Sequence, residues 1–199
     1  LHLILQAGED GSPVLGIGML LDIMDQKQRI LELEKELQKD HFTRLLNKTA
    51  MESYGIRKLG ELQAGERLYM LILDMDHFKR INDSYGHPCG DYVLEQVAEL
   101  MRSLAPEGAR VGRLGGDEFG VLLATERKGE AFVGYAQRLV EETRRIRWQG
   151  IDVQARCSVG IAALRPREGS WMKLYNCADR ALYRAKQSGR DCVHFDQTG

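Results

Sequence analysis

The chain has 199 residues, of which 43% are hydrophobic and 29% charged, and its formal net charge is −1. This length suits one ordinary domain with an appendage. The near-zero charge gives no basic field of the kind that nucleic-acid binding needs. The four cysteines are widely scattered and form no C-x-x-C pair, which argues against a zinc site or a disulfide framework.

No apolar run reaches the ~20 residues that a transmembrane helix needs, so we expect no membrane contact by this part of the protein. The sequence begins at Leu1 without an initiator Met, and we interpret it as a fragment of a longer chain. We expect a cytoplasmic location, which leaves room for a membrane tether upstream in the full-length protein.

Residues 1–22 are predicted to form two strands, Leu1–Gln6 and Val14–Leu21, joined by the turn-rich segment 8–13. An isolated hairpin is not a stable domain in water. We therefore expect this hairpin to be the end of a truncated domain or to pack on a partner.

From Asp22 the pattern becomes helical, and residues 23–39 are predicted to form a linker helix. Apolar residues recur at heptad spacing at Ile23, Ile30, Leu33 and Leu37. The pattern covers about two heptads, so it fits a simple amphipathic helix and a dimerising coiled coil equally well.

From Asp40 onward strands and helices alternate, which is typical of an α+β sheet with helices packed on it. The predicted helices are 49–58, a short one from Phe78, 92–104, 130–147 and 172–187. The predicted strands are 68–73, 153–163 and 192–195, together with a hairpin over 110–124 that carries two glycines at its tip.

The apolar run 68–73 is typical of a strand buried on both faces, and Asp74 and Asp76 follow it on one face. A buried carboxylate is strongly unfavourable unless it is paired or binds a metal. One of the two aspartates could instead cap the helix that follows. Two acids exceed what one cap requires, and the basic Lys79 beside the helix start suits a phosphate group.

The hairpin tip carries a second pair of acids, Asp117 and Glu118, directly after its glycines. Glycine allows a tight turn and close approach of the backbone to a charged ligand. Carboxylates at two strand ends suggest one site for a hard divalent cation, and such sites usually serve phosphate chemistry. The alternative is a solvated turn, in which Gly-Asp pairs are common.

The segment 82–91 is polar and broken by Gly and Pro, which indicates a loop and a new helix start near Asp91. Asp91 is then either the N-cap of that helix or an acceptor for the N1–H and 2-amino groups of guanine, with the Asn82 amide as a second contact. Lys186 and Arg190 end the last long helix, where they suit either the helix dipole or a triphosphate.

These motifs together resemble the GGDEF family of diguanylate cyclases. The resemblance covers about residues 40–196 and rests on the segments 40–48, 74–91, 115–119 and 179–190. The signature Gly-Gly-Asp-Glu-Phe at 115–119 is intact. The opening segment departs from the family pattern D-x-L-T-G-L-x-N-R at Phe42, Arg44 and Lys48.

The resemblance implies a ferredoxin-like palm of the nucleotidyl-cyclase type, with a mainly antiparallel sheet flanked by helices. It implies condensation of two GTP into cyclic di-GMP with release of pyrophosphate. Two Mg²⁺ or Mn²⁺ ions in each half-site would be held by Asp74, the Met75 carbonyl and Asp117. Glu118 would act on the 3′-hydroxyl, as base or second metal ligand. Each palm would hold one GTP, so turnover would require a homodimer.

The resemblance also implies substrate contacts. Guanine would be read by Asn82 and Asp91, with His87 near the base. The phosphates would be contacted by the backbone of Phe78 and by Lys79, Lys186 and Arg190.

The family's product-inhibition motif R-x-x-D would fall at 106–109, where the sequence has neither the Arg nor the Asp. We therefore expect no primary product-inhibition site. More weakly, segment 16–27 resembles the closing strand of a PAS sensor domain and its D-I-T-x-x-K exit. The expected domains are a PAS remnant at 1–22, a linker at 23–39 and the cyclase at 40–199, regulated by an upstream PAS sensor.

Three other functions fit parts of the sequence. A degenerate module would bind GTP or a protein partner without catalysis, but the intact acids and Asn82 argue against it. A cyclase or synthase with another base preference is disfavoured by Asp91, which suits guanine. A purely dimerising sensor fragment would bind no nucleotide.

Overall fold

The computed structural model of the chain describes residues 3–7, 10, 13–17, 20–126 and 129–196, with side chains at residue 10 and from residue 26 onward. The chain divides into two compact units, Leu1–Gln38 and Lys39–Gly199. Within the described ranges, no helix is long and apolar enough to cross a membrane. All four cysteines are free thiols.

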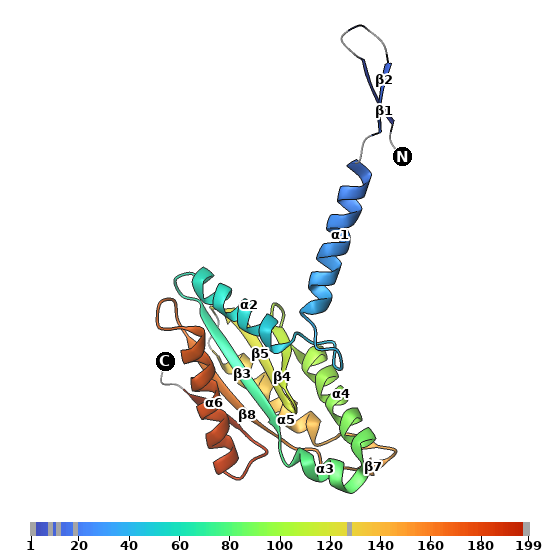
Figure 1. Ribbon diagram of the computed structural model, residues 1–199. Coiled ribbons are helices and arrows are strands. Elements are labelled where there is room, and N and C mark those ends of the chain that lie inside the picture. Colours follow the sequence, from blue (N-terminus) through green and yellow to red (C-terminus); the bar gives the residue numbers. More distant parts are fainter. Residues whose placement is uncertain (1–2, 8–9, 11–12, 18–19, 127–128, 197–199) are drawn as a thin grey trace. The chain divides into compact units, whose positions relative to one another are not determined.

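The first unit holds an antiparallel pair of strands, β1 (Leu3–Ala7) and β2 (Pro13–Ile17), and helix α1 (Leu20–Leu37) (Figure 1). Much of the predicted turn at 8–13 lies outside the described residues, as do positions 1–2 and 18–19 of the predicted strands. The assignment of this hairpin to a PAS domain stays a prediction.

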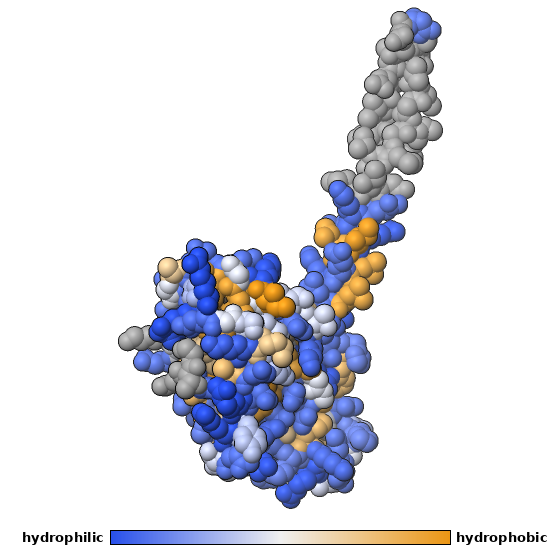
Figure 2. Space-filling view, turned by 60° about the vertical axis from the view of Figure 1, so that its left-hand side comes forward, coloured by the Kyte–Doolittle hydropathy of each residue, from blue (hydrophilic) through white to orange (hydrophobic). Residues whose placement is uncertain are grey.

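Helix α1 exposes apolar side chains along its described part. Ile30, Leu31, Leu33 and Leu37 are between 51% and 78% exposed, and Figure 2 shows them as an orange strip among hydrophilic neighbours. The side chain of Ile23, the first residue of the predicted heptad series, lies outside the described ones. The exposed strip is of the kind that a coiled-coil partner covers.

The second unit is built around a five-stranded sheet of order β4-β5-β3-β8-β9. Neighbouring strands are antiparallel except β8 and β9, which are parallel. The predicted mainly antiparallel sheet is therefore confirmed. The strands are β3 (Arg67–Met75), β4 (Arg110–Gly115), β5 (Glu118–Thr125), β8 (Cys157–Leu164) and β9 (Val193–Asp196).

Helices cover both faces of this sheet (Figure 1). They are α2 (Lys48–Glu61), α3 (Phe78–Tyr85), α4 (His87–Leu104), α5 (Glu130–Thr143) and α6 (Trp171–Gln187). The central strand β3 serves two cores: its odd-numbered residues from Tyr69 pack with α4 and α5, and its even-numbered residues from Leu68 pack with α2 and α6. This alternation explains why the run 68–73 is apolar throughout.

The structure corrects several predicted boundaries. The strand predicted over 153–163 begins only at Cys157, and α1 begins at Leu20, where the second predicted strand was expected to continue. Helix α4 begins at His87 rather than near residue 92, because Pro88 stands in its first turn, where the missing N–H of proline is not needed. Helix α5 ends at Thr143, and the residues beyond it form a small hairpin of β6 (Arg147–Trp148) and β7 (Ile151–Asp152). Strands of two residues leave no periodicity in the sequence to detect.

Candidate active site

The turn at 115–118 joins β4 to β5 and contains two glycines with positive φ angles of 154° and 47°. Arg113 holds this turn, because its guanidinium donates to the Gly116 carbonyl oxygen from Nε at 2.9 Å and from Nη2 at 2.7 Å. The Met75 N–H also donates to the Asp117 carbonyl oxygen at 3.3 Å. The signature turn is thus fixed against the end of β3.

Asp74, Asp117 and Glu118 form an acidic cluster at this meeting point. Asp74 lies directly opposite Glu118 in the antiparallel pair of β3 and β5. Burial, and after it the Asp74 carboxylate, raises the pKa of Asp117 above its ordinary value. The same two causes, in the same order, raise the pKa of Glu118. Carboxylates that repel one another in a partly buried place are typical of a functional site.

One cation reaches the acidic cluster from α6. Lys186 Nζ lies 2.8 Å from Asp74 Oδ1, and its charge lowers the pKa of both Asp117 and Glu118. This counter-charge is incomplete, because the pKa values of both carboxyl groups remain raised. Lys186 is therefore part of the site and not only a favourable charge at a helix end.

The acidic cluster fits a hard divalent cation by its chemistry, since carboxylate oxygens are the ligands that Mg²⁺ prefers. Within the described ranges, no three Asp, Glu, His or Cys side chains are arranged so that they would hold an ion as they stand. The Lys186 ammonium takes one of the Asp74 oxygens. An ion bound to Asp74 would share this carboxylate with Lys186 or displace the ammonium group from it.

Arg113 also ties the signature turn to the opening segment of the unit. Asp40 Oδ1 accepts hydrogen bonds from the N–H and the hydroxyl of Thr43, both at 2.8 Å, and from Arg113 Nη1 at 3.2 Å. The guanidinium lies 5.2 Å from the centre of the Phe42 ring. Burial acts to raise the pKa of Asp40, but these hydrogen bonds outweigh it and lower the pKa below its ordinary value.

The predicted guanine contacts lie where α3 meets α4. An added Cβ at Gly90 would overlap Asn82 Oδ1 and stand 2.9 Å from Asn82 Cγ, so a side chain at position 90 would displace the Asn82 amide. The half-buried Asn82 amide therefore lies beside Gly90, and the exposed Asp91 is the next residue along the chain. Asp91 is not the N-cap of α4, as one prediction had it, because Gly86 occupies that position. His87 is exposed at the start of α4.

The remaining predicted contacts are at the start of α3 and just after α6. Lys79 is exposed and Phe78 half-buried in the first turn of α3, and Arg190 Nε lies 3.9 Å from Asp76 Oδ1. The structure brings together Asp74, Met75, Asp117, Glu118 and Lys186. Among the described residues, it shows no hydrogen bond or ion pair from the acidic cluster to Lys79, Asn82, His87 or Asp91.

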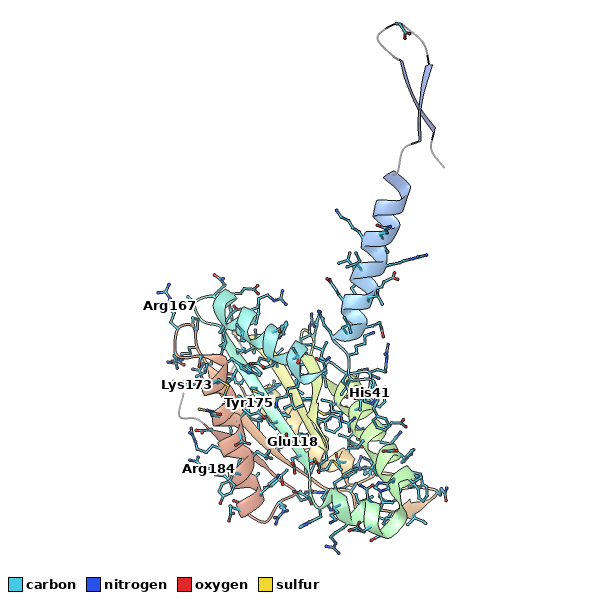
Figure 3. All side chains as sticks on the ribbon, in the orientation of Figure 1. His41, Glu118, Arg167, Lys173, Tyr175 and Arg184 are labelled. Atoms are coloured by element: carbon cyan, nitrogen blue, oxygen red, sulfur yellow. The ribbon has the colours of Figure 1, made fainter. Side chains whose placement is uncertain are left out.

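Two residues of α6 belong to the surroundings of Glu118 and were not predicted from the sequence. Asp179 contributes to the raised pKa of Glu118, and Glu118 and Asp179 add to the effect of burial on the pKa of Tyr175, which is raised. Figure 3 labels Tyr175 on α6 and Glu118 at the start of β5. The available signal was helical spacing, which puts positions 175, 179 and 186 on one face.

Asp76 was weighed as a helix cap, and the structure assigns it differently. The N-cap of α3 is His77, whose own side chain makes no capping hydrogen bond. Asp76 is instead buried, and its oxygens accept hydrogen bonds from Ser158 and Asp191.

The site can be compared with known proteins. The family model "Diguanylate cyclase, GGDEF domain" matches residues 37–192. Diguanylate cyclase A of Treponema denticola is 36% identical over 142 residues, which are 70% of this chain and 38% of that protein. The cyclic di-GMP phosphodiesterase NbdA of Pseudomonas aeruginosa is 36% identical over 159 residues, which are 78% of this chain and 20% of that protein. The chain thus spans less than half the length of these relatives.

Among solved structures, the coiled coil and GGDEF domain of DgcB from Caulobacter crescentus, in complex with c-di-GMP, is similar with a TM-score of 0.80 and 25% identity. The similarity covers 88% of this chain and 94% of that one, and it confirms the expected palm fold. The family model, the relatives and the intact signature agree, and the chain belongs to the GGDEF family of diguanylate cyclase domains.

Proposed function

We propose that this chain is the catalytic part of a diguanylate cyclase, which joins two GTP molecules into cyclic di-GMP. The observation that carries the proposal is the acidic cluster of Asp74, Asp117 and Glu118 at two adjoining strand ends. Partial burial of like charges is unfavourable for a fold, so a function that uses a cation best explains it. The 36% identity to a diguanylate cyclase of Treponema denticola supports the same activity.

The acidic cluster would hold Mg²⁺ or Mn²⁺, two ions in each half-site, through Asp74, the Met75 carbonyl and Asp117. Glu118 would serve as a further ligand or as the base for the 3′-hydroxyl. Such ions lower the pKa of an attacking hydroxyl and neutralise charge on the α-phosphate. The hydrogen bonds from Arg113 to Gly116 would keep the signature turn in place while this charge develops.

The basic residues would receive the triphosphate. Lys186 is within ion-pair distance of Asp74, so a bound phosphate would compete with that carboxylate for the ammonium group. Arg190 and Lys79 would add positive charge, and the Phe78 N–H at the start of α3 would donate to a phosphate oxygen.

The base would be read between α3 and α4. The Asp91 carboxylate would accept hydrogen bonds from the N1–H and 2-amino groups of guanine, and the Asn82 amide would contact the adjoining edge. His87 would lie near the base. Adenine has no 2-amino group, so this pair of residues would favour GTP over ATP.

Cyclisation needs two of these sites. The 3′-oxygen of each GTP attacks the α-phosphate of the other, so two phosphodiester bonds form and two pyrophosphates leave. The described residues of each chain supply one acidic cluster, so cyclisation would require a homodimer in which the two sites face each other. The exposed apolar strip of α1 offers a surface for such a dimer, and we propose that an upstream PAS sensor sets its geometry.

A non-catalytic GTP-binding module is the second candidate, because the relative NbdA, which matches 78% of this chain, is named for a phosphodiesterase activity. The domain alone therefore does not assign the reaction. A catalytic test decides between the two.

The test is incubation of the purified chain with GTP and Mg²⁺, with products read by chromatography and mass detection. We expect cyclic di-GMP and pyrophosphate from the native chain and none from Asp117→Ala. Gly134→Ala is a matched control, because a Cβ there meets no atom within 4 Å. Bound GTP without product, even when a fused coiled-coil zipper enforces the dimer, would establish the non-catalytic module instead.

A further inference from the structure

Asp76 is a buried carboxylate outside the acidic cluster, and the fold satisfies both of its oxygens. Its side chain is 2% exposed. Oδ1 accepts a hydrogen bond from the Ser158 hydroxyl at 2.8 Å, and Oδ2 accepts one from the Asp191 N–H at 3.0 Å. Both oxygens of Asp76 accept hydrogen bonds from protein groups, whereas the neighbouring Asp74 belongs to the acidic cluster and pairs with Lys186.

The Asp191 N–H belongs to a turn with an unusual backbone. Gly189, Arg190 and Asp191 follow one another with φ angles of 105°, 65° and 52°. Left-handed conformation is unfavourable for a residue with a side chain. Two such residues in succession persist only where the surroundings enforce them.

Contacts at three places enforce this turn: the Arg190 N–H, the Asp191 carboxylate and the Asp191 N–H. The Arg190 N–H donates to the Ala185 carbonyl oxygen at 3.1 Å, which ties the turn to the end of α6. The Asp191 carboxylate accepts from Arg144 Nε at 2.9 Å and lies 3.4 Å from Arg156 Nε. The third is the hydrogen bond from the Asp191 N–H to Asp76.

The turn also presents Arg190 in register with Lys186. Lys186 pairs with Asp74 at 2.8 Å, and Arg190 Nε stands 3.9 Å from Asp76 Oδ1. The two acids at the end of β3 are thus each matched by one base at the end of α6. The side chain of Arg190 is 44% exposed, which leaves its guanidinium accessible to a ligand.

We propose that Asp76 is a positioning residue, which holds the turn 189–191 in its left-handed conformation and so aims Arg190 at the triphosphate. The inference rests on the proposed function, because that function assigns Arg190 to a phosphate. Asp76 acts through the turn and touches neither the nucleotide nor an ion.

The experiment compares Asp76→Asn with Asp196→Asn. Asp196 is a matched control, since it is also buried and pairs with an arginine, Arg180, at 2.6 Å. Affinities for GTP and for GMP, which lacks the β- and γ-phosphates, are measured by calorimetry with Mg²⁺ present. We expect Asp76→Asn to weaken GTP about tenfold, as for loss of a hydrogen bond to a charged group, and to leave GMP unchanged. Asp196→Asn should leave the GTP-to-GMP ratio at the native value.

A double variant tests the route through Arg190. Adding Asp76→Asn to Arg190→Ala should weaken GTP no further than Arg190→Ala alone. Hydrogen exchange of the peptide covering 186–192 should be faster in Asp76→Asn than in Asp196→Asn, with or without nucleotide. Equal weakening of GTP and GMP, additive effects of the two changes, or unchanged exchange would overturn the proposal.

These readouts separate this inference from the proposed cyclase activity. A chain that prefers GTP over GMP through Asp76 and Arg190 but forms no cyclic di-GMP would contradict the proposed function alone. A chain that forms cyclic di-GMP while Asp76→Asn behaves as Asp196→Asn would contradict the positioning role alone.

Discussion

Asp40 and Asp76 differ from Asp117 and Glu118 in what surrounds their charges. Asp40 accepts hydrogen bonds from Thr43 and Arg113, and Asp76 accepts from Ser158 and a backbone N–H. Burial and the Asp74 carboxylate instead raise the pKa values of Asp117 and Glu118, and Lys186 offsets this only in part. All four lie in the same unit, close to the same strands.

The contrast shows how one fold separates structural from functional acids. The hydrogen-bonded carboxylates of Asp40 and Asp76 join segments that are distant in sequence. The carboxylates of Asp117 and Glu118 carry negative charge that a bound cation could neutralise. Residues that a fold leaves under strain are expected at functional sites. The predictions below test this distinction, from the largest expected effect to the smallest.

The largest effect is expected for Asp117→Asn. Cyclase activity should fall roughly a thousandfold or more, since a bound ion supplies several kcal/mol of transition-state stabilisation. The melting temperature of the nucleotide-free chain should rise, because one repelling charge is removed, and about 1 kcal/mol corresponds to roughly 2–4 °C at this size. Calorimetry and the product assay measure the two effects. A lower melting temperature would contradict the assignment of strain to the acidic cluster.

Gly90→Ala is expected to weaken GTP binding by about 10- to 100-fold. The added methyl would overlap Asn82 Oδ1 and displace the amide, and a lost polar contact of this kind corresponds to roughly 1–3 kcal/mol. Gly134→Ala, where the methyl meets open space, should leave GTP affinity unchanged. Calorimetric titration compares the two variants. Native GTP affinity in Gly90→Ala would remove Asn82 from the base site.

Arg113→Lys should lower turnover about tenfold. A lysine cannot donate both hydrogen bonds to Gly116 and also reach Asp40, because its ammonium lacks the planar fork of a guanidinium. The control is Arg110→Lys on the same strand, since Arg110 is exposed and its contact with the Tyr54 ring suits either cation. Equal turnover in both variants would show that the link from Asp40 to the signature turn is dispensable.

The two kinds of carboxylate should respond to pH with opposite sign. The folded pKa of Asp40 is lowered, so its stabilisation is present above the ordinary value of 3.8 and is lost as pH falls. The pKa values of Asp117 and Glu118 are raised, so their ionisation reduces the free energy of unfolding as pH rises from their ordinary values through the raised ones. Denaturation experiments across pH 3–8 measure the free energy of unfolding. Asp40→Asn should remove an increase of this free energy with rising pH. Asp117→Asn combined with Glu118→Gln should remove a decrease. Difference curves of the same sign would contradict the distinction.

The smallest effect is expected when the product, cyclic di-GMP, is added to the cyclase assay. Residues 106–109 lack the Arg and Asp of the family's inhibitory motif, so added cyclic di-GMP should leave the initial rate unchanged by that primary route. Strong inhibition that disappears when residues near 106–109 are replaced would refute this expectation. Initial rates over a range of added cyclic di-GMP provide the measurement.

The sequence predicts the parts of the fold that repeat a periodic pattern over many residues. The run 68–73 predicts a strand buried on both faces because β3 packs with α4 and α5 on one side and with α2 and α6 on the other. The start of α4 was predicted too late because Pro88, between Gly86 and Gly90, is typical of a loop. Proline is nevertheless well suited to the first turn of a helix.

The acids could be predicted as a group, but not their separate states. Asp74 and Asp76 look alike in sequence, and only the distant Ser158 and Asp191 distinguish them. Tyr175 and Asp179 likewise join the site only because α6 packs across the sheet beside Glu118. Contacts between residues so far apart along the chain leave no local pattern.

The most direct test of this account counts Mn²⁺ ions by electron paramagnetic resonance in the native chain, Asp76→Asn and Asp117→Asn. Each protein is saturated with α,β-methylene-GTP, which cannot release pyrophosphate at its α-phosphate. We predict the same number of bound ions in the native chain and Asp76→Asn, and fewer in Asp117→Asn. Loss of ions in Asp76→Asn, or an unchanged number in Asp117→Asn, would contradict the division between satisfied and repelling carboxylates.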